Sequence, residues 1–210
     1  MSRLSNSARP QKGAIIAIDP IFPIPTVIAF QYNPEKMTRN LQPNSASSGA
    51  SKAEIRRLDN PPAETITLEA EFDATDGLEV RDPVAVGMGV YPQLSALERL
   101  IYPPAALVIA NTVLTAIGVI EIIPPAAPLT LFVWGAKRVL PVQIQSLGIE
   151  ESAYDERLNP IQAKVNISLK VLSYADMSLL DPGYYIFLSH QIVKEAMSYI
   201  GTANSISNLF

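Results

Sequence analysis

The stretch ETITLEAEF at residues 64–72 decides the fold class of this 210-residue chain. Apolar side chains occupy positions 66, 68, 70 and 72, and threonine or glutamate occupies each position between them. Side chains of a β-strand point alternately to opposite faces, so this period of two indicates one apolar face and one hydrated face. We therefore predict a strand over residues 64–72 whose apolar face lies in a core.

Residues 163–171 alternate in the same way and predict a second long strand within residues 161–174. Pro141 lacks the N–H that a strand ladder needs, which favours an edge position or a bulge for the strand around it. Turns, and not regular helical crossovers, join the predicted strands. The sequence therefore predicts a mainly β protein with a few helices, in which the strands form an antiparallel sheet, barrel or sandwich. Shorter apolar runs predict its other strands, at residues 14–18, 26–32, 129–134, 138–147 and 149–154.

Helical spacing marks two further segments. Apolar residues recur every three or four positions over residues 90–102 and again over residues 184–200. A proline pair, Pro103-Pro104, ends the first helix, and Asp181-Pro182 fits the cap and first turn of the second.

Three parts of the chain are expected. Residues 1–12 are polar, which predicts a flexible arm and no signal peptide. Residues 13–176 form the β domain, which includes a polar stretch at 37–60 that predicts a long surface loop. Residues 177–210 supply a closing helix and a tail.

The segment 105–123 is apolar and lies between two proline pairs. One interpretation is a buried helix or hairpin that packs on the barrel or on a neighbouring subunit, and this is the favoured one. The alternative is membrane contact, because a span needs about 20 apolar residues. Glu121 and the absence of basic flanking residues weigh against a span.

Composition excludes several kinds of site. The chain has no cysteine and only one histidine, so zinc–thiolate, iron–sulfur and disulfide chemistry have no ligands. A net charge of −4 argues against a general phosphate-binding surface, and hence against a nucleic acid partner. Only 17% of residues are charged, against about 25% in an average domain, which suggests surfaces covered by partners.

The search for catalytic motifs finds none. The chain lacks a G-x-S-x-G elbow, a P-loop and a complete dinucleotide fingerprint. Glu69 and Glu71 are interpreted as the hydrated side of a strand, Asp73 and Asp76 as turn residues, and His190 as a packed or surface side chain. We therefore predict a protein that is not an enzyme and has no catalytic residues, cofactor or metal.

Four stretches, taken in order, resemble a known family. They are FQYNPE at 30–35, ETITL at 64–68 leading to Phe72-Asp73, PLTLFVWG at 128–135, and YDE at 154–156 leading to LNPIQA at 158–163. Together they resemble the tube-type domain of contractile injection systems. In particular they resemble the baseplate protein that joins the spike hub to the inner tube, over residues 14–174.

The resemblance implies a β-barrel of the phage tail-tube type with a flanking helix. Six copies would form a ring around a channel and template the polymerisation of the inner tube. The implied partners are the inner tube protein, the spike or hub protein and other baseplate components. Assembly would take place in the cytoplasm, into a phage tail-like particle that is released or docked at a membrane. The motif residues that become candidates for structural or interface roles are Tyr32, Asn33, Pro34, Trp134, Asn159 and Pro160.

Two departures and two alternatives accompany this resemblance. Related adaptors often carry a C-terminal LysM domain, whereas the residues after Tyr174 predict only a helix and a short tail. The apolar segment 105–123 is also unlike the family. The alternatives are a role as the inner tube subunit itself and a role as a membrane-associated anchor that uses residues 105–123.

Overall fold

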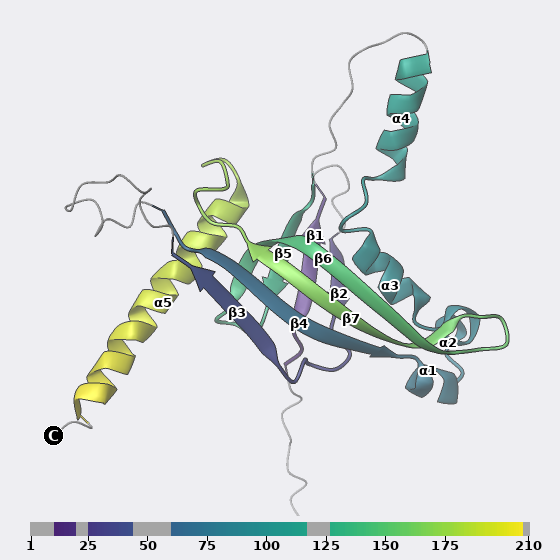
Figure 1. The fold of residues 1–210 in the computed structure, drawn as a ribbon, viewed down its shortest axis with the longest axis horizontal. Helices are drawn as coiled ribbons and strands as arrows, with labels where there is room; N and C mark the ends of the chain where they lie inside the picture. The colour runs from purple at the N-terminus through teal and green to yellow at the C-terminus, as the bar shows by residue number, and fades with distance from the viewer. Residues whose placement is uncertain (1–10, 20–24, 44–59, 117–126, 208–210) are drawn as a thin grey trace, which may run out of the picture.

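Seven antiparallel strands form one sheet in the computed structural model, which describes residues 11–19, 25–43, 60–116 and 127–207 (Figure 1). Their order across the sheet is β2-β1-β5-β6-β7-β4-β3, and each neighbouring pair is antiparallel. The prediction of a mainly β, antiparallel fold is thereby confirmed. The strands are β1 (Ala14–Ile18), β2 (Thr26–Ala29), β3 (Met37–Gln42), β4 (Ala63–Asp73), β5 (Leu129–Val133), β6 (Val139–Tyr154) and β7 (Pro160–Val171).

The two strands with the clearest alternation, β4 and β7, pair with each other. Ile66 lies opposite Leu169 and Leu68 lies opposite Ile167, and all four side chains are buried. Opposed aliphatic pairs of this kind stabilise a sheet as they leave water together. The alternation of apolar and polar residues was therefore enough to predict both strands from the sequence.

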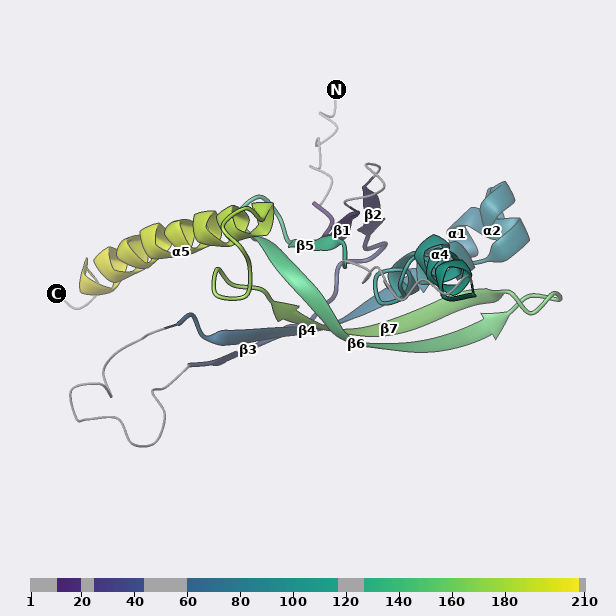
Figure 2. The same cartoon turned by 90° about the horizontal axis from the view of Figure 1, so that it is seen from above.

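The sheet is open, with β2 and β3 at its edges, and this differs from the barrel or sandwich expected. Three short helices take the place of a second sheet: α1 (Thr75–Glu79), α2 (Pro83–Met88) and α3 (Tyr91–Glu98). Leu94 and Leu97 of α3 are buried in one core with residues of β1, β4 and β7. Figure 2 shows that α1, α2, β1 and β2 lie on the same side of the layer formed by β4, β6 and β7. The core is thus closed on that side by helices and by the curled end of the sheet.

A side-chain bridge joins the two ends of the curled sheet. The Gln31 side chain, just after β2, donates to the backbone oxygen of Asp73 at 2.7 Å and accepts from its backbone nitrogen at 2.8 Å. These bonds connect β2 to the end of β4, although the two strands share no ladder.

Two predictions about strands are wrong in detail. The expected loop at 37–60 begins with β3, which is polar and mostly exposed but pairs with β4 from Met37 to Gln42. Residues 44–59 of that loop lie outside the described residues. Pro141 lies in the interior strand β6, paired with Leu131, so the edge alternative is wrong, whereas the bulge alternative agrees with the register shift in β6 between Ile144 and Ser146. Its ring is tolerated because β7 ends there: the nitrogen of Leu172, just past β7, donates to the Pro141 oxygen at 2.9 Å.

The helices agree in part with the sequence. α3 falls within the predicted helix 90–102, and α5 (Pro182–Ser207) extends the predicted C-terminal helix. The Asp181 side chain accepts from the nitrogen of Gly183 at 2.8 Å at the start of α5, as the capping signal indicated. The sequence did not predict α1 and α2, which are too short to show a helical period.

The apolar segment 105–123 forms a helix, α4 (Ala105–Ala116), over its first part, and residues 117–123 lie outside the described residues. α4 has no buried residue and stands away from the sheet in Figure 1. The expectation that this segment packs on the chain's own β domain is therefore wrong for the described part. Among the described residues, no helix combines the length and hydropathy that a membrane crossing requires.

Candidate assembly surfaces

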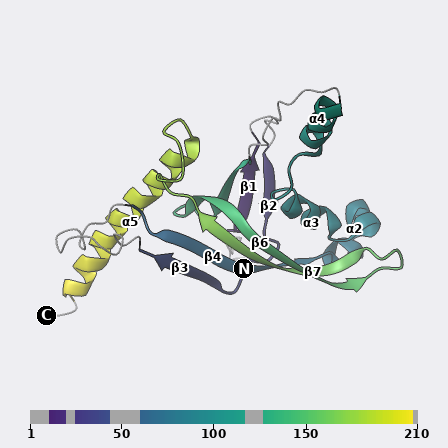
Figure 3. The same cartoon turned by 45° about the horizontal axis from the view of Figure 1, so that its top comes forward.

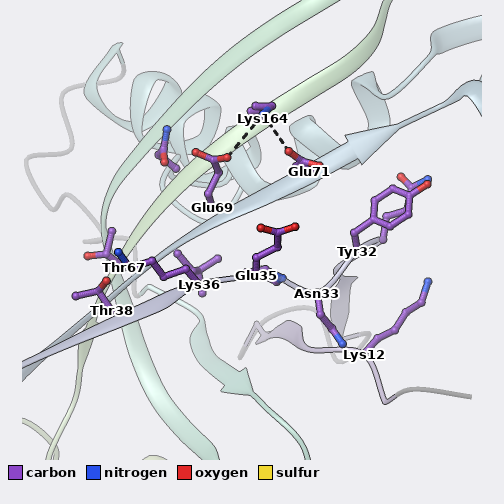
Figure 4. Close-up of a pocket in the computed structure, with 14 residues that line it drawn as sticks. Lys12, Tyr32, Asn33, Glu35, Lys36, Thr38, Thr67, Glu69, Glu71 and Lys164 are labelled. Atoms are coloured by element: carbon purple, nitrogen blue, oxygen red, sulfur yellow. Dashed lines mark ion pairs between the residues drawn. The ribbon is translucent and has the colours of Figure 1, made fainter.

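A polar groove of about 930 Å³ lies over the exposed face of β4 and β7 (Figure 4). Lys164 of β7 lies between two carboxylates of β4, with its Nζ 3.0 Å from Oε1 of Glu71 and 3.9 Å from Oε1 of Glu69. The hydrogen bond to Glu71, together with the charges of both glutamates, raises the pKa of Lys164. All three side chains are about half exposed, so solvent screens these pairs.

The charges of the groove balance. Three glutamates and three lysines line it, and its described lining includes no histidine, cysteine or serine. No group of three or more metal-ligating side chains occurs in the part of the chain that the structure describes. The groove therefore offers hydrogen-bonding groups without a net field. Its charged lining residues are Lys12, Lys36, Lys164, Glu35, Glu69 and Glu71.

Three of the predicted interface residues, Tyr32, Asn33 and Pro34, line this groove together. The Tyr32 ring is about half exposed. The Asn33 side chain, by contrast, fastens the chain before β1: its Oδ1 accepts from the nitrogen of Gly13 at 2.8 Å, and its Nδ2 donates to the oxygen of Gln11 at 2.9 Å. Asn33 thus has an internal role that fixes where β1 begins.

Trp134 meets the same segment from the other direction. Its ring stacks on Phe132 at a centroid distance of 5.9 Å and contacts Phe30 at 6.4 Å. A Cβ at Gly13 would lie only 2.6 Å from the indole, so the tryptophan packs directly on the glycine backbone. Trp134 and Asn33 therefore converge on Gly13, although the sequence places them 101 positions apart.

The other two predicted residues, Asn159 and Pro160, lie at the turn between β6 and β7. Asn159 Nδ2 donates to Asp155 Oδ2 at 2.8 Å and to the oxygen of Gly87 at 3.2 Å. The Pro160 oxygen accepts from the nitrogen of Val90 at 2.9 Å. These bonds fasten the β6–β7 turn to the α2–α3 junction, a role that the sequence motif alone did not reveal.

Asp155 organises the turn itself. Its Oδ1 accepts from the backbone nitrogens of Arg157 at 2.7 Å and Asn159 at 2.8 Å. These bonds, above all the one from the Asn159 side chain, hold the pKa of Asp155 below its usual range. Aspartate is favoured in turns because it can accept from the backbone in this way, so its place ahead of Asn159-Pro160 was a usable sequence signal.

The longest helix, α5, keeps an apolar stripe in solvent. The helical spacing was visible in the sequence, but spacing does not tell whether a stripe is covered within the chain or by another molecule. Large contiguous apolar patches on the surface of soluble proteins mark interaction sites. The exposed residues are Tyr185, Leu188, Ile192, Val193, Met197, Tyr199 and Ile200.

A cavity of about 410 Å³ lies at the base of α5, where the helix crosses the turn between β5 and β6. His190 lines this cavity and is only 8% exposed. The imidazole hydrogen-bonds the backbone carbonyl of Lys137, whereas its Nδ1 has no hydrogen-bond partner among the described residues. Burial, and then the charge of Lys194, lowers the pKa of His190.

This lowered pKa predicts an acid-sensitive stability. In the unfolded chain His190 takes up a proton near pH 6.5. The folded chain disfavours the imidazolium because the ring is buried beside Lys194 and Arg138, and the hydrogen bond to the Lys137 carbonyl and the charge of Glu64 oppose this only in part. The free energy of unfolding should therefore fall as the pH is lowered from 7.5 to 5.5. Urea unfolding at the two pH values measures it. His190 is the only histidine, so the variant His190→Gln should lose most of this dependence of the free energy of unfolding on pH. An equal pH dependence in the parent and the variant would contradict the prediction.

Comparisons with known proteins add no relative. Neither a protein-family model nor a curated protein matches this chain. The chain's own surfaces and its four motif stretches are therefore what bears on its function.

Proposed function

We propose that this protein is a structural ring subunit of the baseplate of a contractile injection system. Six copies surround a channel, join the spike hub to the inner tube, and template the assembly of the tube. The observation that carries the proposal is the apolar stripe of α5, which stays uncovered along a helix of 26 residues. A side-chain stripe of this length is expected to be covered by another chain.

Further features support an incomplete subunit. The edge strands β2 and β3 each leave one row of backbone groups unpaired within the described sheet, and such edges are commonly protected by a neighbour. The exposed face of β4 and β7 is polar and balanced in charge, which suits the wall of a water-filled channel. The four motif stretches add the likeness to the tube-type domain.

The proposal is tested by native mass spectrometry and negative-stain electron microscopy of the full chain. We expect six-fold rings, formed by the chain alone or when it is co-expressed with the tube and hub proteins of its particle. Monomers that bind neither protein would overturn the proposal. Long tubes formed by the chain alone would instead identify it as the inner tube subunit.

Membrane anchoring is a second candidate, favoured by one observation. The apolar side chains of α4 are exposed, among them Val108, Ile109 and Val113. If anchoring is the function, a washed membrane pellet retains the full chain and loses it when residues 105–123 are deleted. Retention in the supernatant, together with rings, would leave the baseplate proposal standing alone.

A further inference from the structure

Two surfaces lie at opposite ends of the molecule. Figures 1, 2 and 3 all place the β6–β7 turn, with α1 and α2, at one end of the long axis and α5 at the other. We propose that neighbouring copies join head to tail, with the β6–β7 turn of one copy seated in the cavity at the base of α5 of the next. This inference rests on the proposed ring and names its contact.

The turn surface, residues 153–158, is rigid and apolar at its tip. Leu158 is 79% exposed and has a φ of +64°, a conformation that bulky side chains rarely adopt. Bonds within the turn hold it there: the Leu158 nitrogen donates to the Asp155 oxygen, and the Asp155 nitrogen to the Asn159 oxygen, both at 3.0 Å. An apolar anchor on a turn that is already ordered binds with little loss of conformational entropy.

The receiving surface is the cavity at the base of α5. Its walls are mainly apolar, with Val139, Ile186 and Val193 among its lining residues, and it is large enough for an aliphatic side chain. The unpartnered Nδ1 of the buried His190 leaves a hydrogen-bond acceptor without a donor within the described chain.

The two surfaces are complementary in charge. The turn surface carries two carboxylates and one arginine, and two further glutamates, Glu150 and Glu151, lie just before it in β6. Lys137, Arg138 and Lys194 lie around His190 together with one carboxylate, that of Glu64, and Glu195 is the only acid in α5. Opposite charges guide encounter and fix register between partners, so an acidic turn should favour this basic cavity over a like-charged surface.

The geometry of the contact determines the assembly. A contact between different surfaces of identical chains repeats from copy to copy, and it ends only when the ring closes. A contact between two α5 helices would instead be symmetric and would stop at a dimer. These two outcomes can be separated by cross-linking.

Cysteine cross-linking tests the inference directly, because the natural chain has no cysteine. Leu158→Cys and Val193→Cys are made singly and together in the full chain, both at positions with exposed side chains. Under mild oxidation the double variant should give a ladder of covalent species up to the hexamer. An equimolar mixture of the two single variants should give dimers, and each single variant alone should stay monomeric in denaturing gels.

The outcomes distinguish the inference from the proposed function. Dimers from Val193→Cys alone would show that α5 meets α5 and would overturn the head-to-tail contact. Rings in electron micrographs without cross-links in the double variant would overturn the contact but leave the ring. Absence of both rings and cross-links would overturn both.

Charge reversal gives a second measurement. Glu156→Lys and Lys194→Glu should each weaken self-association at least about tenfold, and the double reversal should recover most of the loss. Arg99→Glu, at an exposed position at the end of α3 and outside both surfaces, is the matched control and should leave association unchanged. Failure of the double variant to recover would contradict pairing between these surfaces.

Discussion

Gly89→Ala should unfold the junction between α2–α3 and the β6–β7 turn and lower the free energy of unfolding by about 3 kcal/mol or more. A Cβ at this position would lie 2.1 Å from the backbone oxygen of Pro160, and a backbone atom cannot rotate away as a side chain can. The backbone of Gly89, with φ +58° and ψ −133°, is also in a region that is strained for any residue with a Cβ. The new methyl group must therefore push the β6–β7 turn off the helices, breaking the bond from the Val90 nitrogen.

Gly87→Ala is the matched control, two positions earlier in the same helix. No atom lies within 4 Å of a Cβ built there, and alanine is a better helix former than glycine. This variant should be as stable as the parent or gain up to about 1 kcal/mol. Urea unfolding of the three proteins measures the difference, and a Gly89→Ala protein within about 0.5 kcal/mol of the parent would refute the clash.

The strands that were predictable are those whose own side chains carry the pattern. β4 and β7 alternate over their whole length because one face is buried and the other is wet. β3 carries no such pattern, since it lies at an edge with most side chains exposed, and only its ladder with β4 defines it. Local sequence therefore predicted the buried strands and missed the polar edge strand β3.

The openness of the sheet depends on contacts between distant residues. The bridge from Gln31 to Asp73 and the packing of Leu94 and Leu97 on the strands determine how far the sheet curls. Neither the bridge nor this packing leaves a pattern in the neighbouring sequence. The periodicity could therefore indicate an antiparallel β fold but not whether the sheet closes into a barrel. The family likeness carried the expectation of a barrel beyond what the residues themselves supported.

The predicted interface residues illustrate a related limit. Asn33, Trp134, Asn159 and Pro160 make contacts within the chain, and their role between chains stays a prediction. Polar and aromatic motif residues can fasten a fold or contact a partner, and sequence does not separate the two. The exposed apolar stripe of α5 carries no motif at all, whereas the exposed Leu158 begins one of the motif stretches.

Glu64→Ala should be the second strongly destabilised variant, with a loss of about 2–3 kcal/mol. Glu64 is 5% exposed, and its Oε1 accepts from both Nε and Nη2 of Arg39 at 2.6 Å. Removal of one partner of a buried pair typically costs about 3–5 kcal/mol, and the partial exposure of Arg39 reduces that figure. The pair joins the edge strand β3 to β4, so β3 should loosen first.

A neighbouring cation enlarges the effect of losing Glu64. Burial, and then the charge of Arg39, lowers the pKa of Arg138, whereas Glu64 opposes this shift. Without the Glu64 carboxylate, less negative charge offsets the repulsion between the guanidinium groups of Arg39 and Arg138. Glu64→Gln retains an acceptor for Arg39 but not the charge, so it should lie between the parent and Glu64→Ala.

A double-mutant cycle with Arg39→Ala isolates the interaction. If the pair acts as a unit, Arg39→Ala should cost little more in the Glu64→Ala background, because the arginine has already lost its partner. Urea unfolding of the four proteins gives the coupling energy, which should exceed about 1 kcal/mol and fall only modestly in high salt, since a buried pair is weakly screened. If the two losses in the free energy of unfolding were strictly additive, Glu64 would stabilise the fold through its burial alone. The position of β3 would then not depend on the ion pair.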